Sequence, residues 1–219
     1  MKYLGNEGLG KCLDKKQGHP SHAFDYPLST TNHRRRDIAV LDTNGNPIIA
    51  GEFYYAVSAT GTPFEGGLTM FNNDSPVCPD FIVAQSSLGP MDVGIPIVFF
   101  PEDPTQTFVS QGSLDYNIGF KYLSILPECR QLYTTVWTVS TEDSAKSTLV
   151  VLNGEKGDQS SWFKIMKSQE YDGYKIRYSS TSLGGSKSKD VGVVSNEQGV
   201  NLLSIDDAAI PLVVVFVKA

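Results

Sequence analysis

Short runs of β-branched and aromatic residues recur along the chain from Asp37 onward, each bounded by Gly, Pro, Asn or Asp. Such runs between turn-forming residues are typical of β-strands. No stretch after Asp37 keeps a helical apolar period over three turns, so the pattern predicts no helix there. The twelve expected strands are residues 53–57, 68–71, 81–85, 96–100, 116–120, 136–139, 148–152, 162–166, 174–178, 191–194, 201–205 and 212–217.

The expected strands fall into three sets of four that recur at roughly 50–65 residues, a spacing typical of internal repeats. Aromatic residues occupy similar places in each set: Tyr54-Tyr55, Tyr116 and Tyr174 in the first strands, and Phe99-Phe100, Trp162-Phe163 and Phe216 in the fourth. Twelve strands can form a sandwich, a closed barrel or a trefoil. Three pseudo-repeats of four strands favour an all-β fold of the β-trefoil type.

Residues 1–36 lack this pattern, so we expect the folded domain to span residues 37–219 and the first 36 residues to form a flexible tail. The tail contains Cys12 and all three histidines, His19, His22 and His33. Its composition buries too little apolar surface to offset the entropy of ordering it. It also lacks the apolar stretch of a signal peptide. We interpret it as a propeptide, a misassigned leader or a segment added for expression.

Charge and residue usage exclude several classes of function. The net charge of −6 divides into +4 for residues 1–36 and −10 for residues 37–219, and an acidic domain is a poor ligand for nucleic acid. No window reaches the ~18 apolar residues of a membrane span. Residues 37–219 contain no histidine to serve as the base for a serine or cysteine nucleophile, so we expect no enzyme. His19 and His22 lack a third ligand at a fixed spacing, so we expect no metal site.

Eight short sequence strings indicate a particular protein family. They are Val40-Leu41-Asp42-Thr43-Asn44-Gly45-Asn46-Pro47 followed by Gly51 and Tyr54-Tyr55; Gly66-Gly67-Leu68; Cys78-Pro79 with Ile82-Val83-Ala84-Gln85; Gly94-Ile95-Pro96-Ile97-Val98-Phe99; Cys129 ahead of Thr135-Val136-Trp137; Trp162-Phe163-Lys164-Ile165; Tyr174-Lys175-Ile176-Arg177; and Asp190-Val191-Gly192-Val193. In this order, over residues 37–219, they resemble the plant Kunitz (soybean-trypsin-inhibitor-type) protease inhibitors. The resemblance implies a β-trefoil that inhibits an endopeptidase through a rigid loop, as a monomer, without a metal or cofactor.

The resemblance also assigns the cysteines. It implies that Cys78 and Cys129 form a disulfide, which closes a loop of about fifty residues and is worth roughly 3–4 kcal/mol in the chain-entropy model. The second disulfide of the family is absent, because Ser179 and Ser188 stand at its positions. Cys12 is left without a partner. A disulfide-bonded member of this family is expected to be secreted or vacuolar.

Alignment with the family places the reactive loop at Pro101, Glu102, Asp103, Pro104, Thr105, Gln106, Thr107 and Phe108, called the 101–108 loop below. The residue that enters the protease specificity pocket is then Thr105, or Gln106 if the gap shifts. Trypsin requires Arg or Lys there, because its pocket ends in a carboxylate that must be paired. We therefore expect a target other than trypsin. Ala50 occupies the position of the loop-supporting Asn of the family and offers no side-chain hydrogen bond.

Three functions follow from these observations. The first is inhibition of a serine protease through this loop, or of a cysteine or aspartic protease through another surface. The second is a non-inhibitory storage or ligand-binding role, although Cys78-Pro79-Asp80-Phe81-Ile82 departs from the Cys-Pro-Leu-Gly-Ile string of the chlorophyll-binding relatives. The third is a trefoil lectin, which requires a shallow aromatic and polar site in each repeat.

Overall fold

The computed structural model describes residues 37–72, 81–85, 89, 91–121, 134–140, 148–179 and 188–219, which all belong to the compact unit Arg36–Ala219. The described residues form one 3-10 turn, η2 (Gln159–Ser161), and no helix that is long and apolar enough to cross a membrane. The strands are β1 (Phe53–Ser58), β2 (Leu68–Asn72), β3 (Phe81–Gln85), β4 (Ile97–Pro101), β5 (Tyr116–Phe120), β6 (Thr138–Val139), β7 (Val150–Val151), β8 (Phe163–Lys167), β9 (Tyr174–Tyr178), β10 (Lys189–Asp190), β11 (Gly192–Ser195), β12 (Asn201–Ser204), β13 (Ile210–Pro211) and β14 (Val214–Lys218).

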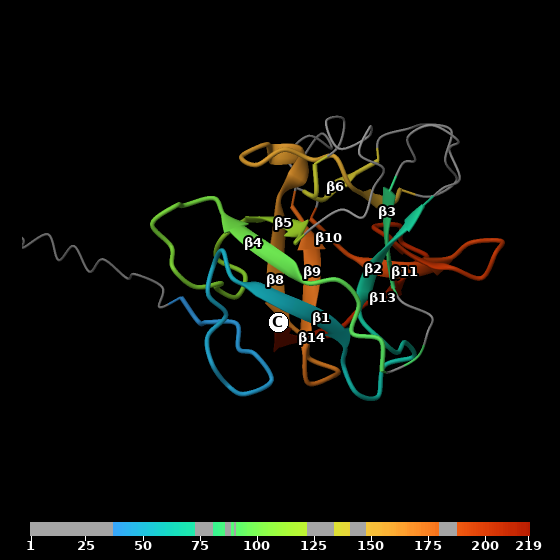
Figure 1. Ribbon diagram of the computed structural model, residues 1–219, viewed down its shortest axis with the longest axis horizontal. Helices are drawn as coiled ribbons and strands as arrows, with labels where there is room; N and C mark the ends of the chain where they lie inside the picture. Colours follow the sequence, from blue (N-terminus) through green and yellow to red (C-terminus); the bar gives the residue numbers. More distant parts are fainter. Residues whose placement is uncertain are drawn as a thin grey trace, which may run out of the picture. The chain divides into compact units, whose positions relative to one another are not determined.

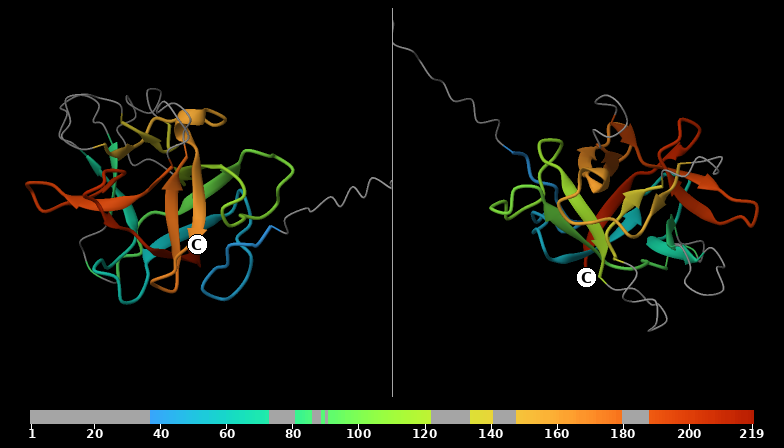
Figure 2. Two further views of the ribbon diagram at one scale, coloured as in Figure 1. Left: turned by 180° about the vertical axis from the view of Figure 1, so that it is seen from behind. Right: turned by 90° about the horizontal axis from the view of Figure 1, so that it is seen from above.

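Six of these strands close into an antiparallel barrel. Each strand pairs with the next in the order β1, β4, β5, β8, β9 and β14, and β14 pairs back with β1 (Figure 1). Three hairpins, β2–β3, β6–β7 and β11–β12, form a second sheet in which β3 pairs with both β7 and β12 (Figure 2). Each third of the chain thus supplies two barrel strands and one hairpin. This arrangement is a β-trefoil, which confirms the fold predicted from the repeat.

The aromatic positions that recur in the sequence fill the interior of the barrel. The rings of Phe99 and Phe216 lie 5.5 Å apart, and those of Tyr174 and Phe216 lie 5.8 Å apart. Phe99 also meets Tyr116 edge-on at 6.2 Å. Strands such as β9 alternate buried and half-buried residues, because successive side chains of a strand point to opposite faces. A core packed in this way gives the surface loops a rigid base.

Two glycines explain why the Gly-Gly-Leu and Gly-Ile-Pro strings meet in the fold. A Cβ atom on Gly67 would lie 1.9 Å from the carbonyl oxygen of Val93, and one on Gly94 would lie 2.1 Å from that of Leu68. The backbones can approach this closely only without side chains. Ile95 N then donates to Leu68 O at 2.8 Å, which fixes the chain just before β4 begins.

The strand boundaries differ from the expectation at the short elements. Strands β10 and β13 were not predicted, since two residues carry no measurable period. The stretches expected at 136–139 and 148–152 shorten to the two-residue strands β6 and β7. The barrel strands β1, β4, β8 and β14 shift from the expected bounds by only one or two residues, so the trefoil arrangement is unchanged.

Candidate functional site: the loop after β4

The 101–108 loop is attached to the barrel at both of its ends. Pro101 is the last residue of β4 and pairs with Tyr116 of β5. At the other end, Phe108 forms a bridge with Ile49, and Ser110 forms one with Ala39. The residues between these attachments extend from the barrel and lie beside the segment that precedes β1 (Figure 1, green and blue).

Two backbone hydrogen bonds hold the part of the loop that lies between its ends. Glu102 N donates to Asp115 O at 2.9 Å on the side where the chain leaves β4. Ala50 N donates to Thr107 O at 3.0 Å on the side where it returns. The side chain of Ala50 contributes no bond, as the sequence predicts, but its backbone supports the loop. Sequence reasoning missed this contact, since any residue except proline can make it.

The tip of the loop is a tight turn closed by Asp103. Gln106 N donates to Asp103 O at 3.0 Å, so Pro104 and Thr105 occupy the centre of the turn. Asp103 Oδ1 also accepts hydrogen bonds from Thr105 N at 2.9 Å and from Thr105 Oγ1 at 2.7 Å. Side-chain bonds of this kind, two residues along the chain, are typical of aspartate in turns. The free loop is therefore a closed turn around Thr105.

The exposed tip carries negative charge. Glu102 and Asp103 are both exposed, and the hydrogen bonds from the hydroxyl and then the amide of Thr105 hold the pKa of Asp103 below its usual value. Lys156 Nζ lies 3.5 Å from the centre of the ring of Phe100, the residue that precedes the loop. An acidic tip is suited to a partner whose cleft is neutral or basic.

The two residues predicted for the specificity position differ in exposure. Thr105 is exposed at the centre of the turn. Gln106 is half-buried, and its Nε2 atom is buried without a hydrogen-bond partner among the described residues. A side chain that enters a protease pocket must be free to leave the surface of its own protein, so Thr105 fits the position better than Gln106.

Two buried tyrosines fix the segments on either side of the loop. Tyr54 OH accepts a hydrogen bond from Ile49 N at 3.0 Å, and Tyr116 OH accepts one from Ser110 N at 2.8 Å. Burial raises the pKa of Tyr116, although the Ser110 bonds oppose the shift. The sequence shows that the tyrosines recur, but not which backbone groups their hydroxyls hold.

The other predicted site residues, Cys78 and Cys129, lie outside the described residues. The expected disulfide between them therefore stays a prediction. Among the described residues, no group of three His, Cys, Asp or Glu side chains is placed to hold a metal ion.

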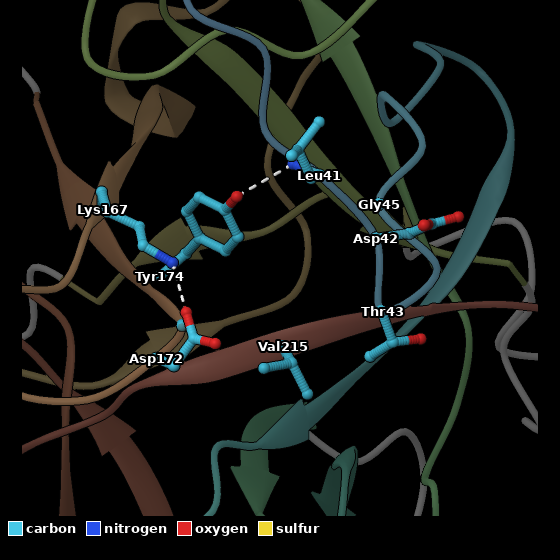
Figure 3. A pocket seen from close by; sticks show the side chains of 9 residues that line it. Leu41, Asp42, Thr43, Gly45, Lys167, Asp172, Tyr174 and Val215 are labelled. Atoms are coloured by element: carbon cyan, nitrogen blue, oxygen red, sulfur yellow. Dashed lines mark hydrogen bonds and ion pairs between the residues drawn. The ribbon is translucent and has the colours of Figure 1, made fainter.

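A shallow pocket of about 340 Å³ lies between the turn after Leu41, the β8–β9 turn and β14 (Figure 3). Two pairs of its lining groups bind one another. Lys167 Nζ lies 2.7 Å from Asp172 Oδ1, and Tyr174 OH accepts a hydrogen bond from Leu41 N at 2.9 Å. A ligand would have to compete with these contacts, so we regard the 101–108 loop as the candidate site.

Comparison with known proteins decides the family. Residues 40–218 match the Kunitz family model described as "Trypsin and protease inhibitor". The chain belongs to this Kunitz inhibitor family. It is 33% identical over 189 residues to Kunitz trypsin inhibitor 4 of Arabidopsis thaliana, an alignment that covers 83% of this chain and 82% of the relative.

Solved Kunitz structures agree with the fold. The soybean trypsin inhibitor in its complex with porcine pancreatic trypsin has a TM-score of 0.67 and 26% identity, over 82% of this chain and 98% of the inhibitor. A water-soluble chlorophyll protein from Brassica oleracea, solved with chlorophyll b, has a TM-score of 0.66 and 28% identity, over 83% of this chain and 99% of that one. The same trefoil thus supports both protease binding and pigment binding in its relatives.

Proposed function

We propose that this Kunitz-family protein is an endopeptidase inhibitor that binds its target through the 101–108 loop and is not specific for trypsin. The observation that carries the proposal is that exposed Thr105 lies between two backbone anchors, Glu102 N to Asp115 O and Ala50 N to Thr107 O. A loop already fixed before binding loses less conformational entropy on association. More of the contact energy then appears as affinity.

The residues of the loop indicate what kind of protease it fits. Thr105 suits a small or tolerant specificity pocket, such as that of elastase or subtilisin. Glu102 and Asp103 would repel the carboxylate of a trypsin-like pocket, and the loop offers no cation to pair with it. A serine protease is the expected target, and a cysteine or aspartic protease would require another surface. We place this function in a secreted or vacuolar setting, where Cys78 and Cys129 can pair.

The Asp103 turn adds a step to binding. A protease needs an extended segment in its cleft, whereas Asp103 Oδ1 here holds both the amide and the hydroxyl of Thr105. The turn must open before Thr105 can enter a pocket. Its bonds are exposed and modest in free energy, and protein–protein contacts can replace them. The anchors at Glu102 and Thr107 lie outside the turn and need not break.

The same turn supports a second candidate, a non-inhibitory storage or ligand-binding protein. A loop that is closed at Pro104 and Thr105 is also what an ordinary surface connection contains. The structural similarity to a chlorophyll-binding protein shows that the trefoil can serve a role other than inhibition in a relative. In this second function, residues 101–108 have no target.

A change of specificity separates the two candidates even while the natural target is unidentified. Thr105→Arg supplies the cation that trypsin requires, and we expect it to inhibit trypsin stoichiometrically where the wild type does not. Thr107→Arg is the matched control, because it adds the same charge to another exposed residue of the loop. Trypsin that stays active and digests the Thr105→Arg loop would favour the non-inhibitory function.

A further inference from the structure

Asp115, which precedes β5, joins three segments of the barrel through its side chain. Its Oδ2 atom lies 2.8 Å from Lys164 Nζ of β8, and its Oδ1 atom accepts a hydrogen bond from the hydroxyl of Ser179, just after β9. Ser179 N in turn donates to Trp162 O at 3.0 Å. The Kunitz resemblance places the two cysteines of the second disulfide at Ser179 and Ser188, and in this chain the Ser179 side chain instead makes a polar contact with Asp115.

The same residue holds the 101–108 loop. The carbonyl oxygen of Asp115 accepts the hydrogen bond from Glu102 N, and the next residue, Tyr116, pairs with Pro101. Any movement of the Asp115 backbone therefore moves the point where the loop leaves the barrel. Its side-chain contacts oppose such movement.

The charge pattern of β8 and β9 favours a carboxylate at this place. Lys164 and Arg177 are direct cross-strand partners, and like charges in such a pair destabilise it. Asp190 pairs with Arg177 at 2.6 Å, and Asp115 pairs with Lys164. The side chains of Lys164 and Asp115 are only 25% and 21% exposed, so solvent screens their contact less than it screens a surface ion pair.

We propose that Asp115 is a positioning residue of the inhibitory loop, held in place by Lys164 and Ser179. This proposal rests on the proposed function for its biological meaning, but its physical content concerns the free protein. The contacts of the Asp115 carboxylate fix the carbonyl oxygen that anchors Glu102. They thereby keep one end of the loop rigid in a chain that lacks the second disulfide.

The proposal predicts a local effect that amide hydrogen exchange can measure by NMR. In Asp115→Ala, the Glu102 amide should exchange about tenfold faster, the change expected from losing a charge-assisted support. The Ala50 amide, which anchors the other side of the loop, is the internal reference and should change by less than about twofold. Ser179→Ala, a smaller change that preserves the ion pair, should accelerate Glu102 by about threefold.

Asp172→Ala is the matched control, because it removes an ion pair of similar length, Lys167 to Asp172, from the β8–β9 turn. It should leave the Glu102 amide unchanged. Equal acceleration at Glu102 and Ala50 in the Asp115 and Ser179 variants, or no acceleration at Glu102, would overturn the positioning role.

Because no protease is present, this result is independent of the Thr105→Arg experiment. Failure of that variant to inhibit trypsin would count against the inhibitory function and leave the exchange result to decide the role of Asp115.

Discussion

Ala50 N lies 3.0 Å from Thr107 O, and this backbone hydrogen bond supports the loop from the residue that the Kunitz resemblance aligns with a loop-supporting asparagine. The bond fixes only one carbonyl of the loop. A side-chain amide at position 50 would add two donors and an acceptor above the same segment. The present loop therefore has only part of the support that an asparagine at position 50 would give it.

Ala50→Asn should strengthen this support. We expect the variant to be cleaved within the 101–108 loop about tenfold more slowly than the wild type by subtilisin or elastase, as one added hydrogen bond implies. Ile49→Asn is the control, since Ile49 is exposed and precedes the supporting position. Cleavage rates can be followed by intact mass. Equal rates for Ala50→Asn and Ile49→Asn would show that residue 50 has no bracing role.

The turn at Asp103 should open in acid. The bonds from Thr105 lower the pKa of Asp103, so they stabilise the turn above the ordinary aspartate pKa of 3.8 and are lost as pH falls through the lower folded value. We expect the Thr105 amide resonance to titrate below pH 3.8. Asp103→Asn should abolish this titration but not that of Ser160, whose amide is held by Asp158 in a similar turn. A Thr105 titration at or above pH 3.8 would contradict the closed turn.

Tyr116→Phe should destabilise the domain and loosen the return of the loop. The change leaves the buried amide of Ser110 without its acceptor, which costs about 1–3 kcal/mol in the free energy of unfolding. Urea denaturation measures this loss. Tyr55 is half-buried and lies next to Tyr54 on the other face of β1. Tyr55→Phe should therefore change the free energy of unfolding by less than about 0.5 kcal/mol. Equal effects of the two substitutions would show that the Tyr116 hydroxyl does not hold Ser110.

Cys78 and Cys129 should be linked in the mature protein. Peptide mass analysis without reductant should detect the linked pair, and reduction should lower the free energy of unfolding by roughly 3–4 kcal/mol. A protein whose two thiols both react with an alkylating agent after denaturation in the absence of reductant would contradict the assignment.

The fold could be predicted because each repeat places a tyrosine near the start of a barrel strand. Tyr54, Tyr116 and Tyr174 recur for one physical reason, since each fills the interior and binds a backbone amide with its hydroxyl. A pattern imposed by a shared core is visible in a single sequence. The two-residue strands β10 and β13 left no such pattern.

The sequence predicts where the candidate site lies but not the contacts that hold it. Alignment of the flanking strings places the reactive loop at residues 101–108 with Thr105 at its centre, and this assignment stays a prediction. The bond from Ala50 to Thr107 depends on register between distant segments, and that between Ser179 and Asp115 joins residues 64 positions apart. The contact between Asp103 and Thr105 differs from these because it is local, and an aspartate two residues before a threonine is a recognisable turn signal in the sequence.

The inhibitory function can be tested by titration of the wild-type protein against elastase, subtilisin, chymotrypsin, trypsin, papain and pepsin, with the mass of the chain measured in each mixture. We expect the activity of at least one enzyme other than trypsin to fall linearly to zero near equimolar protein, while the chain stays intact or is cut slowly between Pro104 and Thr107. Full activity of every enzyme, together with rapid digestion of the loop, would show that the protein is not an inhibitor of this kind.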